Sequence, residues 1–328
     1  MKCTVRKKYL AVVILFAFLL NMTACGNKLQ YDMPYDTKAK SSAFNVVQGR
    51  DTNVLDPFSK DLCIATGDIN TENITIETAY SAVLFDVKNS EVMYAKAPHE
   101  KLFPASITKV MTAIIALKNG SLDQLLTASN SGIIDEEGVT LAGIKPGDTM
   151  TLEQALHLLL ISSANDVALM IAENIGGTVE HFLEMMNDEA KRLGATNTNF
   201  ANPHGLTDPD HYTTAYDLYL IFNEAIKYDK FNEIIHMSEY QTIYYDKNGN
   251  EKKKTIKTTN RYLRGTVETP ENVTIIGGKS GTTMAAGSCL IILSKDAKGS
   301  SYISVILHSK NIDELYKEMT TLLEEINK

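Results

Sequence analysis

Two side chains capable of nucleophilic catalysis stand three residues apart, at Ser106 and Lys109. Pro104, the apolar spacing and Gly120 predict a helix over 107–118, with Ser106 available as its N-cap. A helix places both side chains on one face. A serine hydroxyl attacks poorly unless a base takes its proton, and a lysine can be that base when burial and neighbouring cations lower its pKa.

The alternative interpretation of this pair is an N-cap serine followed by a surface lysine. Ser106 is the only serine in the chain with a lysine three residues later, and two further polar motifs follow it. Those observations favour the catalytic interpretation.

The second motif lies between two apolar runs. Ser163 and Asn165 follow the run 156–161 and precede the run 167–175, which predicts polar residues at the junction of two buried helices. Buried polar groups cost free energy unless they are hydrogen-bonded, so these residues either bond loop backbone or line a site. Ser-x-Asn occurs again at 309–311, so the tripeptide alone is weak evidence for a site. The apolar runs on both sides of Ser163 give it weight.

The third motif places Lys279 among glycines at 277, 278 and 281. A phosphate-binding loop is excluded because Val273 stands where its first glycine is required. Strand-like runs at 273–276, 288–294 and 302–308 predict that Lys279 lies on or beside a sheet strand, where glycines let another backbone approach. The alternative is a surface lysine.

Composition limits the function classes. The chain has 328 residues, 44% of them hydrophobic, which is enough for one large core or two modest domains. A net charge of −8 argues against a nucleic-acid partner. The sequence has no Cys-x-x-Cys and no His-Glu-x-x-His, so we predict neither a metal nor another cofactor. Whether Cys63 and Cys289 form a disulfide is left open.

The N-terminus carries a targeting signal. Four basic residues precede an apolar run at 9–20, too short for a comfortable membrane span, and 22–26 reads Met-Thr-Ala-Cys-Gly. This segment resembles the lipobox of bacterial lipoproteins, in which the cysteine, here Cys25, receives the lipid. We therefore expect a signal peptide at 1–24, a tether at 25–61 and an extracytoplasmic domain at 62–328, held at the cell membrane by lipid. The alternatives are an ordinary cleaved signal or an uncleaved anchor.

Further patterns predict the surrounding elements. A hairpin is expected at 79–87 and 91–95, and another at 241–257, whose lysines at 252–254 we assign to a solvated edge. Thr151 and Gln154 have capping-box spacing. Residues 121–149 suggest short helical pieces, whereas 178–193, 213–226 and 311–328 suggest longer helices.

The three motifs, in this order, resemble the penicillin-interacting serine enzymes. The detail is similar to the low-molecular-mass penicillin-binding proteins, the D-alanyl-D-alanine carboxypeptidases of serine peptidase family S11. Residues 105–113 match their active-site signature, and 163–166, 202–206 and 214–217 match their Ser-Ala-Asn-Asp, Asn-x-His-Gly-Leu and Thr-Ala-x-Asp motifs. The resemblance runs from about residue 74 to the end. Ser280 departs from the usual threonine, and we expect the family's C-terminal β-rich domain to be absent, with lipid on Cys25 replacing its anchor.

The resemblance implies an α/β (α+β) fold of the β-lactamase/DD-peptidase type, with an antiparallel sheet flanked by helices and an all-α subdomain. It implies that Ser106 is the nucleophile, that Lys109 is the base and that Ser163 relays a proton to the leaving group. His204 and Asp217 are assigned to structure. The residues implied in substrate and oxyanion binding are Asn165, Lys279, Ser280, Gly281, Thr282 and Thr283.

The function implied is a serine-type D-Ala-D-Ala carboxypeptidase of cell-wall and cell-shape maintenance. It would remove the terminal D-alanine from peptidoglycan stem peptides through an acyl-enzyme on Ser106, and penicillin and other β-lactams would inhibit it. One alternative is a serine β-lactamase, although no Glu-x-x-Leu-Asn run follows Ser163 closely. Another is a catalytically silent peptidoglycan-binding lipoprotein.

Overall fold

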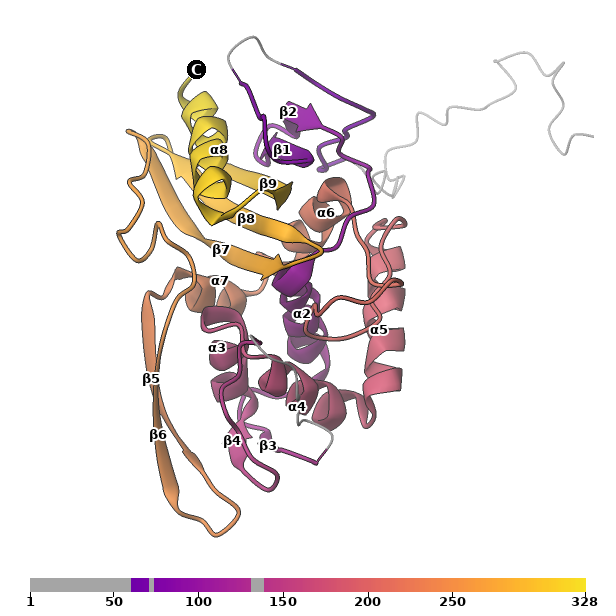
Figure 1. Ribbon diagram of the computed structural model, residues 1–328, viewed down its shortest axis with the longest axis vertical. Helices are drawn as coiled ribbons and strands as arrows, with labels where there is room; N and C mark the ends of the chain where they lie inside the picture. Colours follow the sequence, from indigo (N-terminus) through magenta and orange to yellow (C-terminus); the bar gives the residue numbers. More distant parts are fainter. Residues whose placement is uncertain (1–59, 71–73, 131–138) are drawn as a thin grey trace, which may run out of the picture. The chain divides into compact units, whose positions relative to one another are not determined.

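The computed structural model describes residues 60–70, 74–130 and 139–328, all of which fall within one compact unit (Figure 1). The predicted signal peptide at 1–24, the lipid site at Cys25 and nearly all of the tether at 25–61 lie outside the described residues, so these assignments stay predictions. Among the described residues, no helix has the length and hydropathy that crossing a bilayer requires.

A five-stranded antiparallel sheet joins the two ends of this unit (Figure 1). The order is β2-β1-β9-β8-β7, so β1 pairs with β9 and β7 forms one edge. The predicted hairpin at 79–95 is confirmed as β1–β2. The strands are β1 (Ser81–Asp86), β2 (Glu91–Lys96), β7 (Val273–Thr283), β8 (Gly287–Asp296) and β9 (Ser301–Ser309).

The sheet is a central layer, because apolar side chains on both of its faces are buried. Along β1, Val83 and Phe85 belong to the main core, whereas Leu84 packs in a second core with residues of helix α8 (Ile312–Glu324). Successive strand residues point to opposite faces, so this alternation places α8 on one face and the other helices on the opposite face. Figure 1 shows α8 lying across β8 and β9.

Helices α3, α4, α5 and α6 pack around α2, which explains why every residue from Lys109 to Ala116 is buried, whereas α7 packs against α3 and β7. Polar residues begin most of these helices; Thr151 and Gln154 form the predicted capping box. This layer confirms the predicted antiparallel sheet flanked by helices with an all-α part. The helices are α2 (Lys109–Asn119), α3 (Leu152–Ile161), α4 (Asn165–Gly176), α5 (Val179–Arg192), α6 (Ala215–Ala225) and α7 (Asp229–His236).

A second sheet has the order β3-β4-β5-β6, comprising Leu125–Thr127, Thr149–Thr151, Glu239–Tyr245 and Glu251–Lys257. The predicted hairpin at 241–257 is confirmed as β5–β6. The short helical pieces expected in 121–149 are wrong for the described part of that stretch, which holds strands β3 and β4. Their residues pair with neighbouring strands instead of continuing an apolar helical face.

The solvated-edge assignment is wrong for two of the three lysines at 252–254. The Lys252 ammonium donates to the buried Asp148 carboxylate at 3.2 Å, and that of Lys254 donates to the Ala142 carbonyl at 2.6 Å. Sequence showed a run of like charges, but the register of β5–β6 beside β4 directs alternate lysines onto the loop that precedes β4.

The two cysteines of the folded unit are both free and buried. The Cys63 thiol donates to the Asp86 carbonyl at 3.3 Å, and the Cys289 thiol donates to the Ala286 carbonyl at 3.5 Å. Burial raises the pKa of Cys63 to about 11 and that of Cys289 to about 12. Both side chains are therefore unreactive thiols of the core, and the open question of a disulfide between them is resolved against it.

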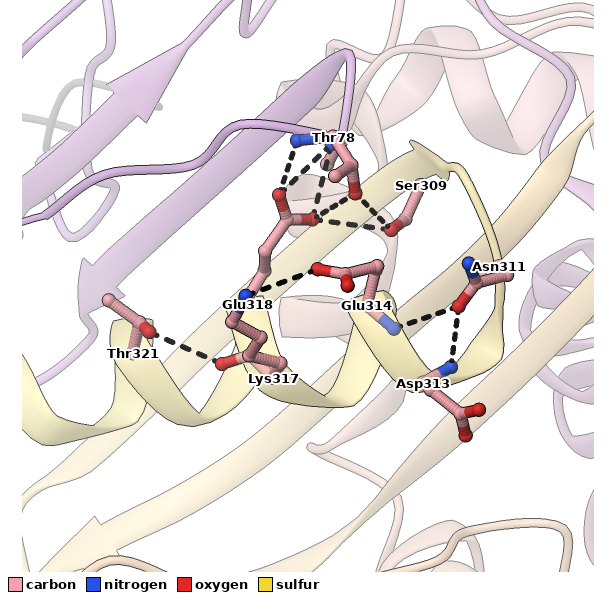
Figure 2. Close-up of polar contacts among 9 residues, drawn as sticks. Thr78, Ser309, Asn311, Asp313, Glu314, Lys317, Glu318 and Thr321 are labelled. Atoms are coloured by element: carbon pink, nitrogen blue, oxygen red, sulfur yellow. Dashed lines mark hydrogen bonds and ion pairs between the residues drawn. The ribbon is translucent and has the colours of Figure 1, made fainter.

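A buried carboxylate joins α8 to the start of β1 and the end of β9. Figure 2 shows the Glu318 carboxylate, 4% exposed, beside Thr78 and Ser309. It accepts hydrogen bonds from the backbone N–H of Thr78 at 2.5 Å, from the backbone N–H of Ala79 at 3.1 Å and from the Ser309 hydroxyl at 3.2 Å. Because all of these partners are donors, the site fits an acceptor-only group.

Replacing Glu318 by glutamine should lower the free energy of unfolding by roughly 1–3 kcal/mol, because the new amide NH₂ would face buried donors. Urea denaturation of the two proteins measures the change. Glu324→Gln on the exposed face of α8 is the matched control and should leave stability within about 0.5 kcal/mol of wild type. Equal unfolding midpoints for Glu318→Gln and the control would contradict this prediction.

Candidate active site

A strained turn presents Ser106. The 3₁₀ helix η2 (Ala105–Thr108) begins after Pro104 and runs directly into α2. Ala105 has φ +48°, in the left-handed region that non-glycine residues rarely adopt. The expectation that Ser106 caps the helix is wrong, because the turn starts one residue earlier and no side-chain cap bond is made. The Ser106 hydroxyl is thereby left to meet Lys109.

Lys109 is fully buried and its amine has three oxygen partners. The Lys109 Nζ atom lies 2.9 Å from the Ser106 hydroxyl oxygen, 2.5 Å from Asn165 Oδ1 and 2.6 Å from the carbonyl oxygen of His204. The predicted nucleophile and base are therefore in hydrogen-bond contact, which is the geometry that proton transfer between them requires.

The electrostatic surroundings favour an uncharged Lys109. Burial holds the pKa of its amine well below the usual value, and the nearby Lys279 charge lowers that pKa further, while Asp166 opposes the shift. An amine that is neutral near neutral pH has a free lone pair and can accept a proton from a hydroxyl.

The second predicted group faces the first from the edge of the sheet. The Lys279 amine, 1% exposed on β7, donates to the Ser163 hydroxyl at 3.0 Å and to the carbonyl of Ser280 at 2.7 Å. Ser163 lies in the short connection between α3 and α4 with φ +65°, and Asn165 opens α4. Burial lowers the pKa of Lys279 to about 7. The polar helix junction therefore lines a site.

Glycine at 281 brings β7 against the nucleophile's turn. A Cβ atom at Gly281 would lie 2.6 Å from the backbone nitrogen of Ser106 and 2.9 Å from the Ala105 Cβ, closer than real Cβ contacts allow. Only glycine lets the strand and the turn approach to this distance.

The remaining predicted residues of β7 follow in register. The Ser280 hydroxyl donates to Thr259 Oγ1 at 2.8 Å, and Thr283 Oγ1 lies 3.2 Å from Thr207 Oγ1. Thr282 pairs with Ser288 of β8 and has an exposed side chain. Among the described strands β7 lies at the edge of its sheet, so one side of its backbone has no neighbour there.

One wall of the site was missed by sequence reasoning, which gave 202–206 only a structural role. The carbonyl of His204 accepts from Lys109, and the carbonyl of Pro203 accepts from the Thr112 hydroxyl at 2.6 Å. Burial lowers the pKa of the His204 imidazole to about 3. The hydrogen bond to Lys109 is accepted by the backbone of His204, and residue type does not indicate which carbonyl will act as an acceptor.

His211 supports the same wall from behind. It is 1% exposed, and its Nδ1 atom accepts from the backbone N–H of Ala201 at 3.0 Å. The Nε2–H group therefore donates to Thr108 Oγ1 at 2.8 Å, and the Thr108 hydroxyl donates in turn to the Ala105 carbonyl at 2.8 Å. Burial lowers the pKa of His211 to about 4, so it stays neutral. This chain of bonds fixes the turn that carries Ser106.

Asp166 holds the loop beside Asn165. Its buried carboxylate accepts from the backbone N–H groups of Ala142 at 2.9 Å, Gly143 at 2.8 Å and Ile144 at 3.2 Å. The same residue lies in the first turn of α4, where a negative charge is favourable. Among the described residues, no group of three or more histidine, cysteine or carboxylate side chains could hold a metal ion.

Residues 69–311 match the family Peptidase_S11, described as D-alanyl-D-alanine carboxypeptidase. The chain belongs to this family. The predicted family is therefore confirmed, and the match includes all three motifs.

Curated relatives agree with this assignment. The chain is 32% identical over 252 residues to the D-alanyl-D-alanine carboxypeptidase DacF of Bacillus subtilis, covering 75% of this chain and 61% of the relative. It is 31% identical over 250 residues to DacC of Escherichia coli, covering 74% of this chain and 59% of the relative. The match thus spans about three fifths of the length of these carboxypeptidases.

A solved structure has the same fold. The crystal structure of the Streptomyces K15 DD-transpeptidase superposes with a TM-score of 0.72 and 25% identity, covering 77% of this chain and 98% of that chain. The predicted fold of the DD-peptidase type is confirmed.

Proposed function

We propose that this member of the carboxypeptidase family is a serine-type D-Ala-D-Ala carboxypeptidase that removes the terminal D-alanine from peptidoglycan stem peptides. The observation that carries the proposal is the fully buried Lys109 amine, which lies 2.9 Å from the Ser106 hydroxyl and whose pKa is held well below its usual value by burial and by Lys279. A surface lysine beside a capping serine, the competing interpretation, would have neither the burial nor the lowered pKa.

In the acylation step, the Ser106 hydroxyl oxygen attacks the carbonyl carbon between the two terminal D-alanines while its proton passes to Lys109. The backbone N–H groups of Ser106 and Thr282 stabilise the oxyanion, each donor contributing about 3 kcal/mol. The C–N bond then breaks, and the leaving amine takes a proton through the Ser163 hydroxyl. Water hydrolyses the ester on Ser106, releasing the shortened peptide.

The terminal carboxylate of the substrate is received by Lys279, supported by the hydroxyls of Ser280 and Thr283. Asn165 keeps Lys109 in place through its Oδ1 atom at 2.5 Å and orients the substrate amide. A β-lactam places a carbonyl and a carboxylate at similar separation, so penicillin would acylate Ser106 in the same way.

Incubating the protein with acetyl-Lys-D-Ala-D-Ala and measuring released D-alanine tests the proposal. Fluorescent penicillin should label the protein, and peptide mapping by mass spectrometry should place the adduct on Ser106. Ser106→Ala should abolish both signals, whereas Ser121→Ala, an exposed serine elsewhere, should leave them unchanged. Fast, continuous nitrocefin hydrolysis would indicate a β-lactamase, and labelling without release of D-alanine would contradict the carboxypeptidase activity.

The Lys109–Lys279 pair predicts a pH effect. A charged Lys279 disfavours protonation of Lys109, so Lys279→Met should raise the pKa of Lys109. At a given acidic pH a smaller fraction of Lys109 would then be neutral, and the acid limb of the acylation rate should move to higher pH. Rates of labelling by fluorescent penicillin, measured pH by pH, check this shift.

The control for this pH effect is Lys295→Met, which removes an exposed lysine from the neighbouring strand β8. Its acid limb should coincide with that of wild type. A limb that stays in place or moves to lower pH in Lys279→Met would count against the electrostatic coupling.

We further propose that the enzyme acts outside the cytoplasm and is held at the cell membrane by lipid on Cys25. The support is the basic start, apolar run and small residues before Cys25 in the sequence. Globomycin treatment of producing cells should cause retention of the signal peptide, as should Cys25→Ala. Unaltered processing would argue against the lipid anchor.

A further inference from the structure

A cavity of about 310 Å³ opens where β7 ends, and none of its residues has a role in the chemistry described above. Its volume lies at the lower end of the range for small-ligand pockets. Much of its wall is apolar or aromatic, with two groups that can carry positive charge. The lining includes Phe103, Pro209, Tyr212, Ala285, Lys101 and His308.

Chain connectivity places the cavity close to the catalytic serine. Phe103 precedes Ser106 by three residues and Ala285 follows Thr283 by two. Even a fully extended chain spans at most about 3.6 Å per residue, so the Cα of Phe103 lies within about 11 Å of that of Ser106. By the same limit, Ala285 lies within about 7 Å of Thr283.

The loop that supplies the opposite wall is tied to β7. Thr207 Oγ1 lies 3.2 Å from Thr283 Oγ1, and the chain continues from Thr207 to Pro209 and Tyr212. Leu102 then joins this loop to the segment before Ser106, because Leu102 and Thr213 exchange backbone hydrogen bonds of 2.8 and 2.9 Å. The cavity is therefore framed by elements that also position the active site.

The direction of the substrate follows from the proposed function, on which this inference rests. A peptide whose C-terminal carboxylate is at Lys279 and whose scissile carbonyl is at Thr282 runs along the free edge of β7. Its upstream residues then extend past Thr283 toward Ala285. At about 3.3 Å per residue, the residue two places before the acylated D-alanine lies roughly 7 Å beyond it. Ala285, which lines the cavity, lies within a similar distance of Thr283.

The walls indicate which side chain fits. Phe103, Pro209 and Tyr212 offer an apolar surface, and the Lys101 ammonium lies over the Tyr212 ring, 4.3 Å from its centroid. Lys101 is exposed, so its charge stays available to a ligand. We infer that this cavity is a subsite for an upstream residue of the stem peptide that has an aliphatic stem and a carboxylate.

Three peptides test the subsite. The short one is acetyl-Lys-D-Ala-D-Ala; the second is extended at its N-terminus by a γ-linked D-glutamyl residue with a free α-carboxylate, and the third has that carboxylate amidated. Wild type should show the highest kcat/KM with the acidic long peptide. Lys101→Met should lower kcat/KM about fivefold for that peptide alone. Lys298→Met, an exposed lysine between β8 and β9, is the matched control and should change nothing.

A second variant tests the cavity itself. Ala285→Phe fills it and should lower kcat/KM about tenfold for both long peptides while sparing the short one. Hydrolysis of the short peptide with no preference among the three, or equal losses on all three in the variants, would overturn the subsite and leave the proposed function intact. Hydrolysis of none of them by wild type would overturn both.

Discussion

Replacing Lys109 by methionine should slow acylation of Ser106 by about 100- to 10,000-fold, the usual contribution of a general base. Methionine has similar length and packs in the core, so the fully buried site should still fold. It has no lone pair basic enough to accept the serine proton, and the acceptors at Asn165 and His204 lose their donor. The second-order rate of labelling by penicillin measures the loss.

Two further substitutions separate the base from the bulk of the side chain. Lys109→Arg keeps a cation that does not release its proton near neutral pH, so it should be as inactive as the methionine variant. Lys118→Met removes an amine from the same helix, where it pairs with Glu189, and should acylate at the wild-type rate. Substantial acylation by Lys109→Arg would show that an uncharged amine is not required.

Spacing was enough to predict the part of the site that lies within one helical turn. Ser106 and Lys109 meet because Lys109 comes three positions after Ser106 on the η2–α2 turn, a local relation that the sequence displays. The polar junction between two buried helices at Ser163 could also be predicted, because the runs on both sides of it are apolar. Strands β1, β2, β8 and β9 followed from their apolar runs, and the edges of most helices followed from caps and glycines.

Contacts between distant segments could not be predicted from spacing alone. Ser163 and Lys279 are 116 residues apart, and they meet because the last strands fold beside β1 and place β7 at the sheet edge. No local pattern fixes that strand order. The family resemblance predicted that the three motifs lie together in one site. The residues by themselves predicted only what chemistry each motif could do.

Contacts made by backbone groups and by partly buried charged side chains also could not be predicted from the sequence. Every residue has a backbone carbonyl, so the residue type at 204 does not indicate that the His204 carbonyl binds Lys109. The two imidazole nitrogens of His211 bond partners that are 103 and 10 residues away in the sequence. The charge pattern predicted that Lys252 and Lys254 lie on a solvated edge, but Lys252 bonds the Asp148 carboxylate and Lys254 bonds the Ala142 carbonyl. In each case the deciding partner lies in a loop whose path only tertiary structure determines.

Replacing Gly205 by alanine should both destabilise the fold and disable the site. Gly205 has φ +91°, and a Cβ there would lie 1.9 Å from the carbonyl oxygen of Ala105 and 2.9 Å from Thr108 Oγ1. Backbone strain and overpacking together predict a loss of roughly 2–6 kcal/mol in the free energy of unfolding. The turn must shift to relieve the contact, and a displacement of about 1 Å at Ser106 costs about 100-fold in rate.

Gly249→Ala is the matched control for strain, because Gly249 has φ +80° at the tip of the β5–β6 hairpin and a Cβ there meets nothing within 4 Å. It should cost only about 1–2 kcal/mol and leave acylation by penicillin unchanged. Urea denaturation and labelling rates of both variants measure the difference. Equal losses of stability and equal acylation rates in Gly205→Ala and Gly249→Ala would contradict the prediction that packing of the 202–206 turn against Ala105 holds Ser106 in place.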